Sequence, residues 1–211
     1  MFGKKSIWKH LDTFLRRRNE IDVHRRYLAS PDEENTVRFL RRLGIACYEV
    51  SDLNHAASVD LLKRLRPDYG IAAVDQLLSP ALIACFPTLL NAHYGNLPQI
   101  KGWNATEWSI LLHRRLDVCL HEIVERVDAG RIYLKESIVV EKGDDFEILR
   151  RKCQDAAKRL YLRFFERPDE CKKRYERNDE GRNYYLMNWQ LKALAQKALL
   201  HAVADHPAVD H

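Results

Sequence analysis

The 211-residue sequence lacks several features that mark particular classes of protein. No apolar run reaches the roughly 18–20 residues that a membrane span needs, and the basic start (residues 1–10) lacks the apolar core and cleavage site of a signal peptide. The five cysteines form no Cys-x-x-Cys pair, and no His/Cys cluster has zinc spacing. We therefore expect a cytoplasmic protein with reduced thiols, no bound metal and no membrane contact.

Charge of one sign is not concentrated anywhere either. The formal net charge is +5, but the basic clusters are scattered and interleaved with acidic residues. These clusters lie at 16–18, 25–26, 41–42, 150–152 and 172–174. Without a basic stripe or a nucleic-acid-binding motif, they indicate solvated helix faces and no nucleic-acid partner. A smaller role, the attraction of a phosphorylated substrate, stays open.

The periodicity of the apolar residues predicts strands that alternate with helices. Strand-like segments lie at 21–28, 45–50, 69–74 and 88–93. Helical segments lie at 5–19, at 31–43, between a cap at Asp52 or Asn54 and Pro67, after the cap Ser79, and at 103–114. This alternation predicts an α/β fold with a Rossmann-like, mostly parallel sheet and helices on both of its faces.

The second half of the chain changes this pattern. Strands predicted at 118–124 and 131–140 are joined too closely for a crossover helix, so this end of the sheet should be antiparallel. A long amphipathic helix follows at 145–165. We expect residues 1–165 to form one α/β domain. Residues 166–211, with a charged loop, the aromatic residues Tyr184, Tyr185 and Trp189, and a final helix, should form a helical extension packed on it.

The residues with the clearest chemical potential lie at 91–130. Asn91 and His93 end an apolar strand, and the strand period of two puts their side chains on one side. Asp128 follows in an Asp-Ala-Gly turn. Taken singly, His93 could be a loop histidine and Asp128 a turn residue. Together, an amide, an imidazole and a carboxylate can stabilise an oxyanion and move a proton.

The ordered set Asn91-x-His93, Leu97-Pro98, Lys101-Gly102 and Asp128-x-Gly130 resembles the catalytic half of the tetrahydrofolate-dependent formyltransferases. That family includes glycinamide ribonucleotide, methionyl-tRNA and amino-sugar formyltransferases, and the resemblance covers roughly residues 21–150. It implies that Asn91 hydrogen-bonds the formyl oxygen and that His93 stabilises the tetrahedral oxyanion and takes part in proton transfer. Asp128 would hold His93 and help pass the proton to the leaving folate nitrogen.

The resemblance also assigns a folate site and supporting residues. Main-chain groups of two loops would bind the folate, one loop with Gln76, Leu77 and Leu78 and the other with Glu125, Arg126 and Val127. Leu77 and Leu78 would flank the pterin. The alternative, that these loops simply cap the next helix, stays open. His121 would support the site from behind, with core packing as the open alternative, and Asn104 would face the site. The Leu97–Pro98 peptide would be cis.

The resemblance implies transfer of a formyl group from 10-formyltetrahydrofolate to a primary amine. Tyr94-Gly95-Asn96 replaces the Pro-Ser-Leu that is usual in the purine enzyme, and no Gly-rich phosphate loop precedes the first helix. Residues 166–211 are too few for the barrel domain of methionyl-tRNA enzymes. An amino-sugar nucleotide, an amino acid or a secondary metabolite is left as the acceptor. The alternatives are a 10-formyltetrahydrofolate hydrolase and a non-catalytic relative that binds folate or a partner.

One part of the family pattern has no counterpart here. The family places a buried central strand before the first helix, and residues 1–4 cannot form one. We therefore expect a sheet without this first strand. Either the coding region begins further upstream, or the protein covers the open strand edges by rearrangement or as a homodimer.

Overall fold

The computed structural model describes residues 36–74 and 76–202. The chain forms two compact units, Met1–Ser51 and Asp52–His211. In the first, α2 (Thr36–Arg42) confirms the described part of the helix predicted at 31–43. The helix at 5–19, the strand at 21–28 and the expected loss of the first strand all concern residues outside the described ranges. The strand predicted at 45–50 was wrong: Ile45 and Tyr48 are exposed, and no described strand pairs with this segment.

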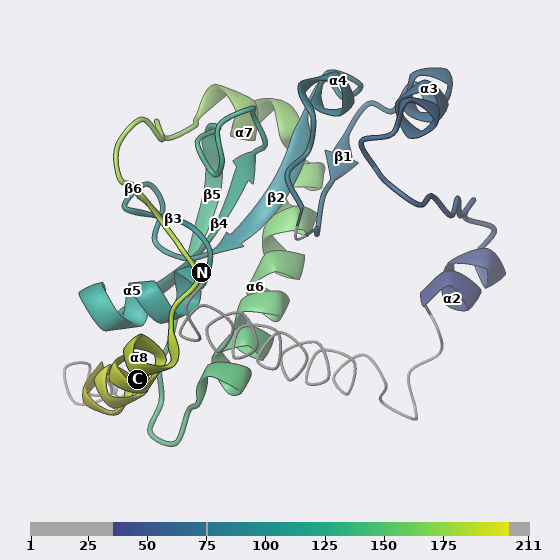
Figure 1. Ribbon diagram of the computed structural model, residues 1–211. Coiled ribbons are helices and arrows are strands. Elements are labelled where there is room, and N and C mark those ends of the chain that lie inside the picture. The colour runs from purple at the N-terminus through teal and green to yellow at the C-terminus, as the bar shows by residue number, and fades with distance from the viewer. Residues whose placement is uncertain (1–35, 75, 203–211) are drawn as a thin grey trace, which may run out of the picture. The chain divides into compact units, whose positions relative to one another are not determined.

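The second unit contains the other described helices and strands (Figure 1). In chain order these are α3 (Ala56–Leu65), β1 (Gly70–Ile71), α4 (Pro80–Ile83), β2 (Leu89–Tyr94), β3 (Ile100–Gly102), α5 (Ala105–His113), β4 (Leu116–Glu122), β5 (Ile132–Ile138), α6 (Phe146–Glu166), α7 (Pro168–Lys173), β6 (Arg182–Tyr184) and α8 (Trp189–Ala202).

The main sheet has the strand order β1-β2-β4-β5. β1 is parallel to β2, whereas β4 is antiparallel to both β2 and β5. The α/β fold with an antiparallel end is therefore confirmed. Among the described strands of this sheet, however, antiparallel pairs are more frequent than expected. β1 is shorter than the predicted strand at 69–74, because only Gly70 and Ile71 pair with β2.

One face of the main sheet is covered by α6, which runs along β2, β4 and β5 (Figure 1). Asp145 caps this helix by accepting a hydrogen bond from the Ile148 amide. The core between helix and sheet is fully apolar, and its main members are Leu90, Val118, Leu120, Leu149, Cys153, Leu160 and Phe164. Because alternate residues of β2 and β4 are used for this core, the intervening side chains are presented on the opposite face.

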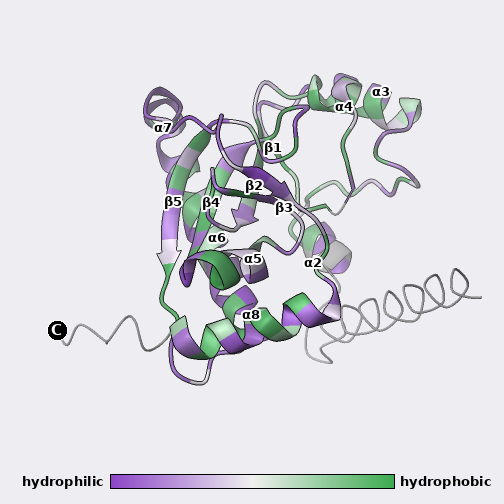
Figure 2. Ribbon diagram, turned by 60° about the vertical axis from the view of Figure 1, so that its left-hand side comes forward, coloured by the Kyte–Doolittle hydropathy of each residue, from purple (hydrophilic) through white to green (hydrophobic). Residues whose placement is uncertain are grey.

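The segment after α6 returns to that opposite face. β6 pairs in parallel with β3, and Glu176 forms an isolated bridge with Ile132. α8 lies alongside α5 (Figure 2), and Asn104 accepts a hydrogen bond from the Met187 amide. β3 and β6 were not predicted from the sequence, because three residues are too few to show an alternating pattern.

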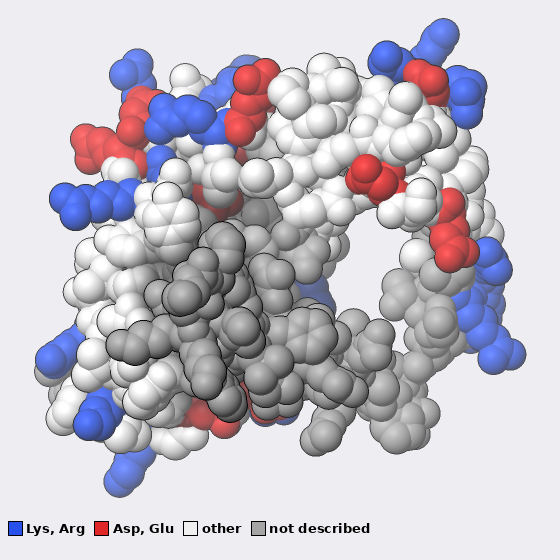
Figure 3. Space-filling view, in the orientation of Figure 1, with Lys and Arg blue, Asp and Glu red and all other residues white. Residues whose placement is uncertain are grey.

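The surface carries charges of both signs. On the face shown in Figure 3, Lys and Arg side chains are interspersed with Asp and Glu. Within the described ranges, no helix has the length and apolar character that crossing a bilayer requires.

Candidate active site

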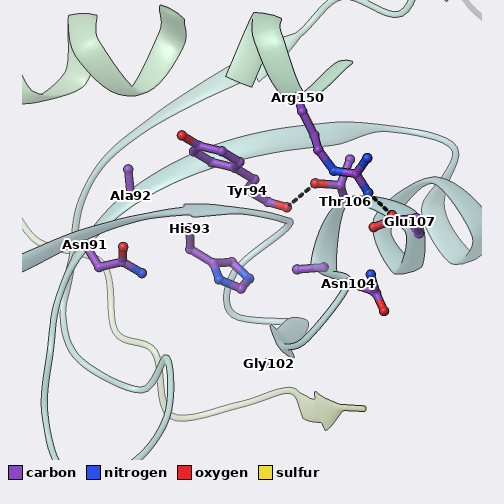
Figure 4. Close-up of a pocket in the computed structure, with 10 residues that line it drawn as sticks. Asn91, Ala92, His93, Tyr94, Gly102, Asn104, Thr106, Glu107 and Arg150 are labelled. Atoms are coloured by element: carbon purple, nitrogen blue, oxygen red, sulfur yellow. Dashed lines mark hydrogen bonds and ion pairs between the residues drawn. The ribbon is translucent and has the colours of Figure 1, made fainter. Parts of the chain in front are cut away.

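β2 and β4 bring Asn91, His93 and His121 to the sheet face opposite α6. Their antiparallel register sets Asn91 opposite His121 and His93 opposite Cys119. Figure 4 shows the His93 ring on one side of β2 and the Tyr94 ring on the other. The strand period of two therefore places the predicted amide and imidazole on the same side, as the sequence indicates.

Asp128 reaches these side chains from the turn after β4. Its backbone has a φ of 47°, in the left-handed region. The turn also needs Gly130, because a Cβ atom there would lie 1.9 Å from the Glu122 carbonyl oxygen. The Gly102 amide donates to Asp128 Oδ2 at 2.8 Å, which fixes the carboxylate. Asp128 Oδ2 then lies 3.3 Å from His93 Nδ1, so the structure brings the predicted amide, imidazole and carboxylate together.

The hydrogen bonds of His93 limit where its protons can be. Its Nε2 lies 2.9 Å from the Ile100 carbonyl oxygen, which can only accept, so Nε2 carries a proton and donates. Nδ1 can then donate to Asp128 only when the ring holds both protons. His93 Nδ1 and Asp128 Oδ2 face each other at 3.3 Å, close enough for the carboxylate to hold the ring in place. Gly95 leaves room for the ring, since a Cβ there would lie 2.9 Å from Nε2.

His121 is a neutral imidazole behind this pair. Burial lowers its pKa to about 4, and the nearby Asp128 carboxylate only partly opposes this effect. Nδ1 donates to the Glu122 carbonyl oxygen at 2.8 Å, so Nε2 presents a lone pair. That lone pair accepts from Asn91 Nδ2 at 3.4 Å. His121 thus orients the Asn91 amide. The second N–H of Asn91 Nδ2 can then donate to another group.

The lowered pKa of His121 predicts a pH dependence of stability. The unfolded chain protonates this residue near pH 6.5, but the folded chain resists until about pH 4. Between these values the unfolded state binds more protons, so the free energy of unfolding should fall as the pH falls from 6.5 to 4, by about 3 kcal/mol at most. Above pH 6.5, His121 should not make the free energy of unfolding depend on pH. Denaturant titrations should give a flatter profile for His121→Gln, and equal slopes would contradict the burial argument.

A pocket of about 270 Å³ opens beside His93 and Asn91. The N-terminal turn of α5 and Asn104 line it, together with Arg150 from α6. In Figure 4, Arg150 reaches Glu107 with its guanidinium group, and the two form an ion pair. Glu107 is buried, whereas 47% of the Arg150 side chain is exposed and this residue lines the pocket. The predicted residue Asn104 is thus at the pocket, and Glu107 and Arg150 are additional members.

Residues in or next to the two predicted folate loops pack against one small apolar cluster. Leu78 and Ile123, the latter just before the loop at 125–127, both pack against the cluster of Val59, Leu82 and Leu89. Asn54 donates to the Leu77 carbonyl oxygen and accepts from the Ser79 amide, so it holds the first loop and does not cap α3. His55 caps α3 in its place.

The exposure of these loop residues fits a surface that a ligand could cover. Leu77 is 74% exposed, and Gln76, Glu125, Arg126 and Val127 are exposed as well. Ser79 caps α4 as predicted. The loop at 76–78 therefore leads into a helix cap, and this structural role exists whether or not the loop binds a ligand.

Cys119 lies beside the site but is not suited to act as a nucleophile. Burial raises the pKa of its thiol to about 12, and its Sγ donates to the Gly95 carbonyl oxygen. All described cysteines are unpaired. Among residues 36–74 and 76–202, no three His, Cys, Asp or Glu side chains are arranged to hold a metal ion.

Two buried polar residues near Asp128 were missed as site residues. Lys101 belongs to the Lys-Gly motif, and its Nζ donates to the Asn178 carbonyl oxygen at 2.8 Å. Burial, and next the charge of Arg126, lowers the pKa of Lys101. Asn178 lies in a charged stretch with no recognisable motif, so no sequence signal pointed to it. The Leu97–Pro98 peptide is cis, as the resemblance implies.

Known proteins share this fold and this sequence pattern. Residues 18–165 match the family model described as formyl transferase. The formyltransferase PseJ from Anoxybacillus kamchatkensis, solved with UDP-4,6-dideoxy-4-formamido-L-AltNAc and tetrahydrofolate, is 18% identical, with a TM-score of 0.57 over 81% of this chain and 95% of that chain. A sugar N-formyltransferase from Shewanella sp. FDAARGOS_354 is 16% identical, with a TM-score of 0.55 over 77% and 70% of the two chains.

A third solved structure is phosphoribosylglycinamide formyltransferase from Bacillus halodurans. It is 25% identical, with a TM-score of 0.51 over 58% of this chain and 68% of that chain. The structural likenesses show the shared fold, and the family model covers more than half of the sequence. The chain therefore belongs to the formyl transferase family.

Proposed function

We propose that this protein transfers a formyl group from 10-formyltetrahydrofolate to the primary amine of a small molecule. The observation that carries the proposal is the contact of His93 with Asp128 beside Asn91, at the edge of an open pocket. Membership of the formyl transferase family supports it. The tetrahydrofolate bound to the similar PseJ structure supports a folate donor. We place the reaction in the cytoplasm, as the sequence analysis does.

In the proposed reaction, the amine nitrogen attacks the formyl carbon and forms a tetrahedral intermediate. The free N–H of Asn91 and the Nε2–H of His93 donate to the oxyanion, for which His93 must exchange its bond to Ile100 for one to the substrate. Asp128 accepts the proton that the amine loses and delivers it to N10 of the folate. The bond from carbon to N10 then breaks, and the products are a formamide and tetrahydrofolate.

The folate would occupy the side of the site formed by the two exposed loops. Leu77, Leu78 and Val127 offer apolar surface to the pterin ring, and the main chain of Gln76, Glu125 and Arg126 offers hydrogen-bonding groups. Main-chain recognition suits a flat heterocycle with alternating donors and acceptors. The pocket beside α5 would then be left for the acceptor.

For the acceptor we propose an amine that carries an anionic group, such as an amino-sugar nucleotide. The exposed part of Arg150 can pair with a phosphate while Glu107 holds the guanidinium in place. The similar PseJ was solved with UDP-4,6-dideoxy-4-formamido-L-AltNAc, a sugar nucleotide with a formamido group, which supports this choice.

The double variant Glu107→Gln/Arg150→Gln should raise the KM for a phosphate-bearing amine by on the order of tenfold, because a charge-assisted hydrogen bond is lost. Removing both charges avoids leaving Glu107 buried and unpaired. The kcat value and the KM for an uncharged amine should be unchanged. Steady-state kinetics with matched charged and uncharged amines would measure this, and an equal KM change for both amines would contradict the assignment.

Absorbance measured on mixing the protein with 10-formyltetrahydrofolate separates the proposed function from its two alternatives. Loss of the donor only when an amine is present supports transfer. Loss at the same rate without an amine indicates a hydrolase. Binding without any loss of the donor indicates a non-catalytic folate-binding relative.

A further inference from the structure

We propose that Asn178, in the segment after α7, is a positioning residue that holds the Asp128 turn in its active geometry. The inference rests on the proposed function, because Asp128 is assigned there to proton transfer. It makes the C-terminal segment part of the catalytic site, although this segment follows Asp128 by 50 residues.

The contact between Asn178 and the turn is direct and buried. Asn178 is 2% exposed, and its Nδ2 donates to two carbonyl oxygens, that of Asp128 at 2.7 Å and that of Gly130 at 2.9 Å. One amide group thus spans the turn and uses both of its hydrogens. The reversed orientation of the amide would set its oxygen against two acceptors, so the geometry fixes which atom faces the turn.

The amide oxygen of Asn178, unlike its Nδ2, takes part in no hydrogen bond within the described residues. Asn178 Oδ1 is buried and finds no hydrogen-bond donor within the described part of the chain. A buried acceptor of this kind is costly. The two donors therefore explain why an amide at this position suits the fold, and a carboxylate of the same shape would remove both of them.

The segment that carries Asn178 is itself firmly held. Lys101 Nζ donates to the Asn178 carbonyl oxygen, and the backbone of Glu176 is hydrogen-bonded in both directions with that of Ile132. Gly181, with a φ of 91°, lies so close to Pro98 that a Cβ atom would sit 1.7 Å from the Pro98 carbonyl oxygen. Contacts of residues 176, 178 and 181 therefore hold the backbone around Asn178 in place, independently of the contact between its side chain and the turn.

The turn needs such support because Asp128 has a backbone conformation that a non-glycine residue seldom adopts. Residues held in that region persist only where their surroundings determine the conformation. Gly102 fixes the carboxylate, and Asn178 fixes the carbonyl group of the same residue. With Asn178 changed, we expect the carboxylate to move away from His93 Nδ1.

The test compares Asn178→Asp and Asn178→Ser with Ser137→Ala. Ser137 donates to Asp117 at the far end of β4 and β5, so its variant loses a part-buried hydrogen bond away from the site. We expect kcat to fall roughly 100-fold in Asn178→Asp, since a shift of about 1 Å costs that much. Asn178→Ser has a shorter side chain that no longer reaches both carbonyl oxygens, but it sets no negative charge against them and should lose less. The KM values for folate and amine should stay within about threefold in both variants, and Ser137→Ala should keep its kcat.

A second readout does not depend on turnover. Amide hydrogen exchange should become faster at Gly102 and at residues 126–132 in both Asn178 variants, while the amides of α6 exchange as before. A kcat of Asn178→Asp equal to that of the wild type, or exchange in the turn that does not change, would overturn the inference. A wild type without transfer activity would refute the proposed function, and the exchange data would still decide whether Asn178 holds the turn.

Discussion

Asp128→Asn should abolish formyl transfer, with kcat reduced on the order of 100-fold or more. The substitution keeps the shape of the side chain but removes the group that accepts the proton of the amine. It also places an amide between the Gly102 N–H, which needs an acceptor, and His93 Nδ1. Because the proposed folate loops do not use the Asp128 side chain, the dissociation constant for the folate should stay within several-fold. Steady-state kinetics and a fluorescence titration with the folate would measure both quantities.

Asp117→Asn is the matched control for this prediction. Asp117 is a buried carboxylate that accepts from Ser137 and lies near Arg115, away from His93. This variant should lose stability but keep its kcat within about twofold, since it touches no reacting group. Unchanged turnover in Asp128→Asn, or an equal loss in Asp117→Asn, would show that the carboxylate at 128 has no special role.

The second large effect is expected for His93→Ala. Without the imidazole, the oxyanion loses one of its two proposed donors and Asp128 loses the ring that its carboxylate contacts. We expect turnover to fall on the order of 100-fold or more, again with folate affinity within several-fold. His113→Ala, which removes an exposed histidine at the end of α5, should have no effect on turnover. Folate binding lost together with turnover would indicate that His93 supports the fold and not the chemistry.

The central part of the fold could be predicted because its residues carry local signals. β2 is a short apolar strand, and its period of two puts Asn91 and His93 on one face. α4 begins at the predicted cap Ser79, and the predicted helix at 145–165 is α6, whose first amides are capped by Asp145. These features depend on neighbours within a few residues, so they are visible in a single sequence.

The remaining features depend on contacts between distant parts of the chain. β3 and β6 form only because Ile100 and Arg182 are brought side by side, and neither strand has a pattern of its own. The strand expected at 45–50 has suitable residues but no described partner, and pairing decides whether a strand forms. Asn178 is invisible in the sequence for the same reason, because its importance comes from a turn 50 residues away.

Transfer of an isotopically labelled formyl carbon tests the central claim most directly. The protein would be mixed with 10-formyltetrahydrofolate labelled at the formyl carbon and with an amino-sugar nucleotide, and the carbon would be followed by NMR. We predict that the label appears in a formamide of the sugar, with release of tetrahydrofolate, and that this signal is lost in His93→Ala. Label recovered as formate, at a rate that the amine does not change, would contradict the account.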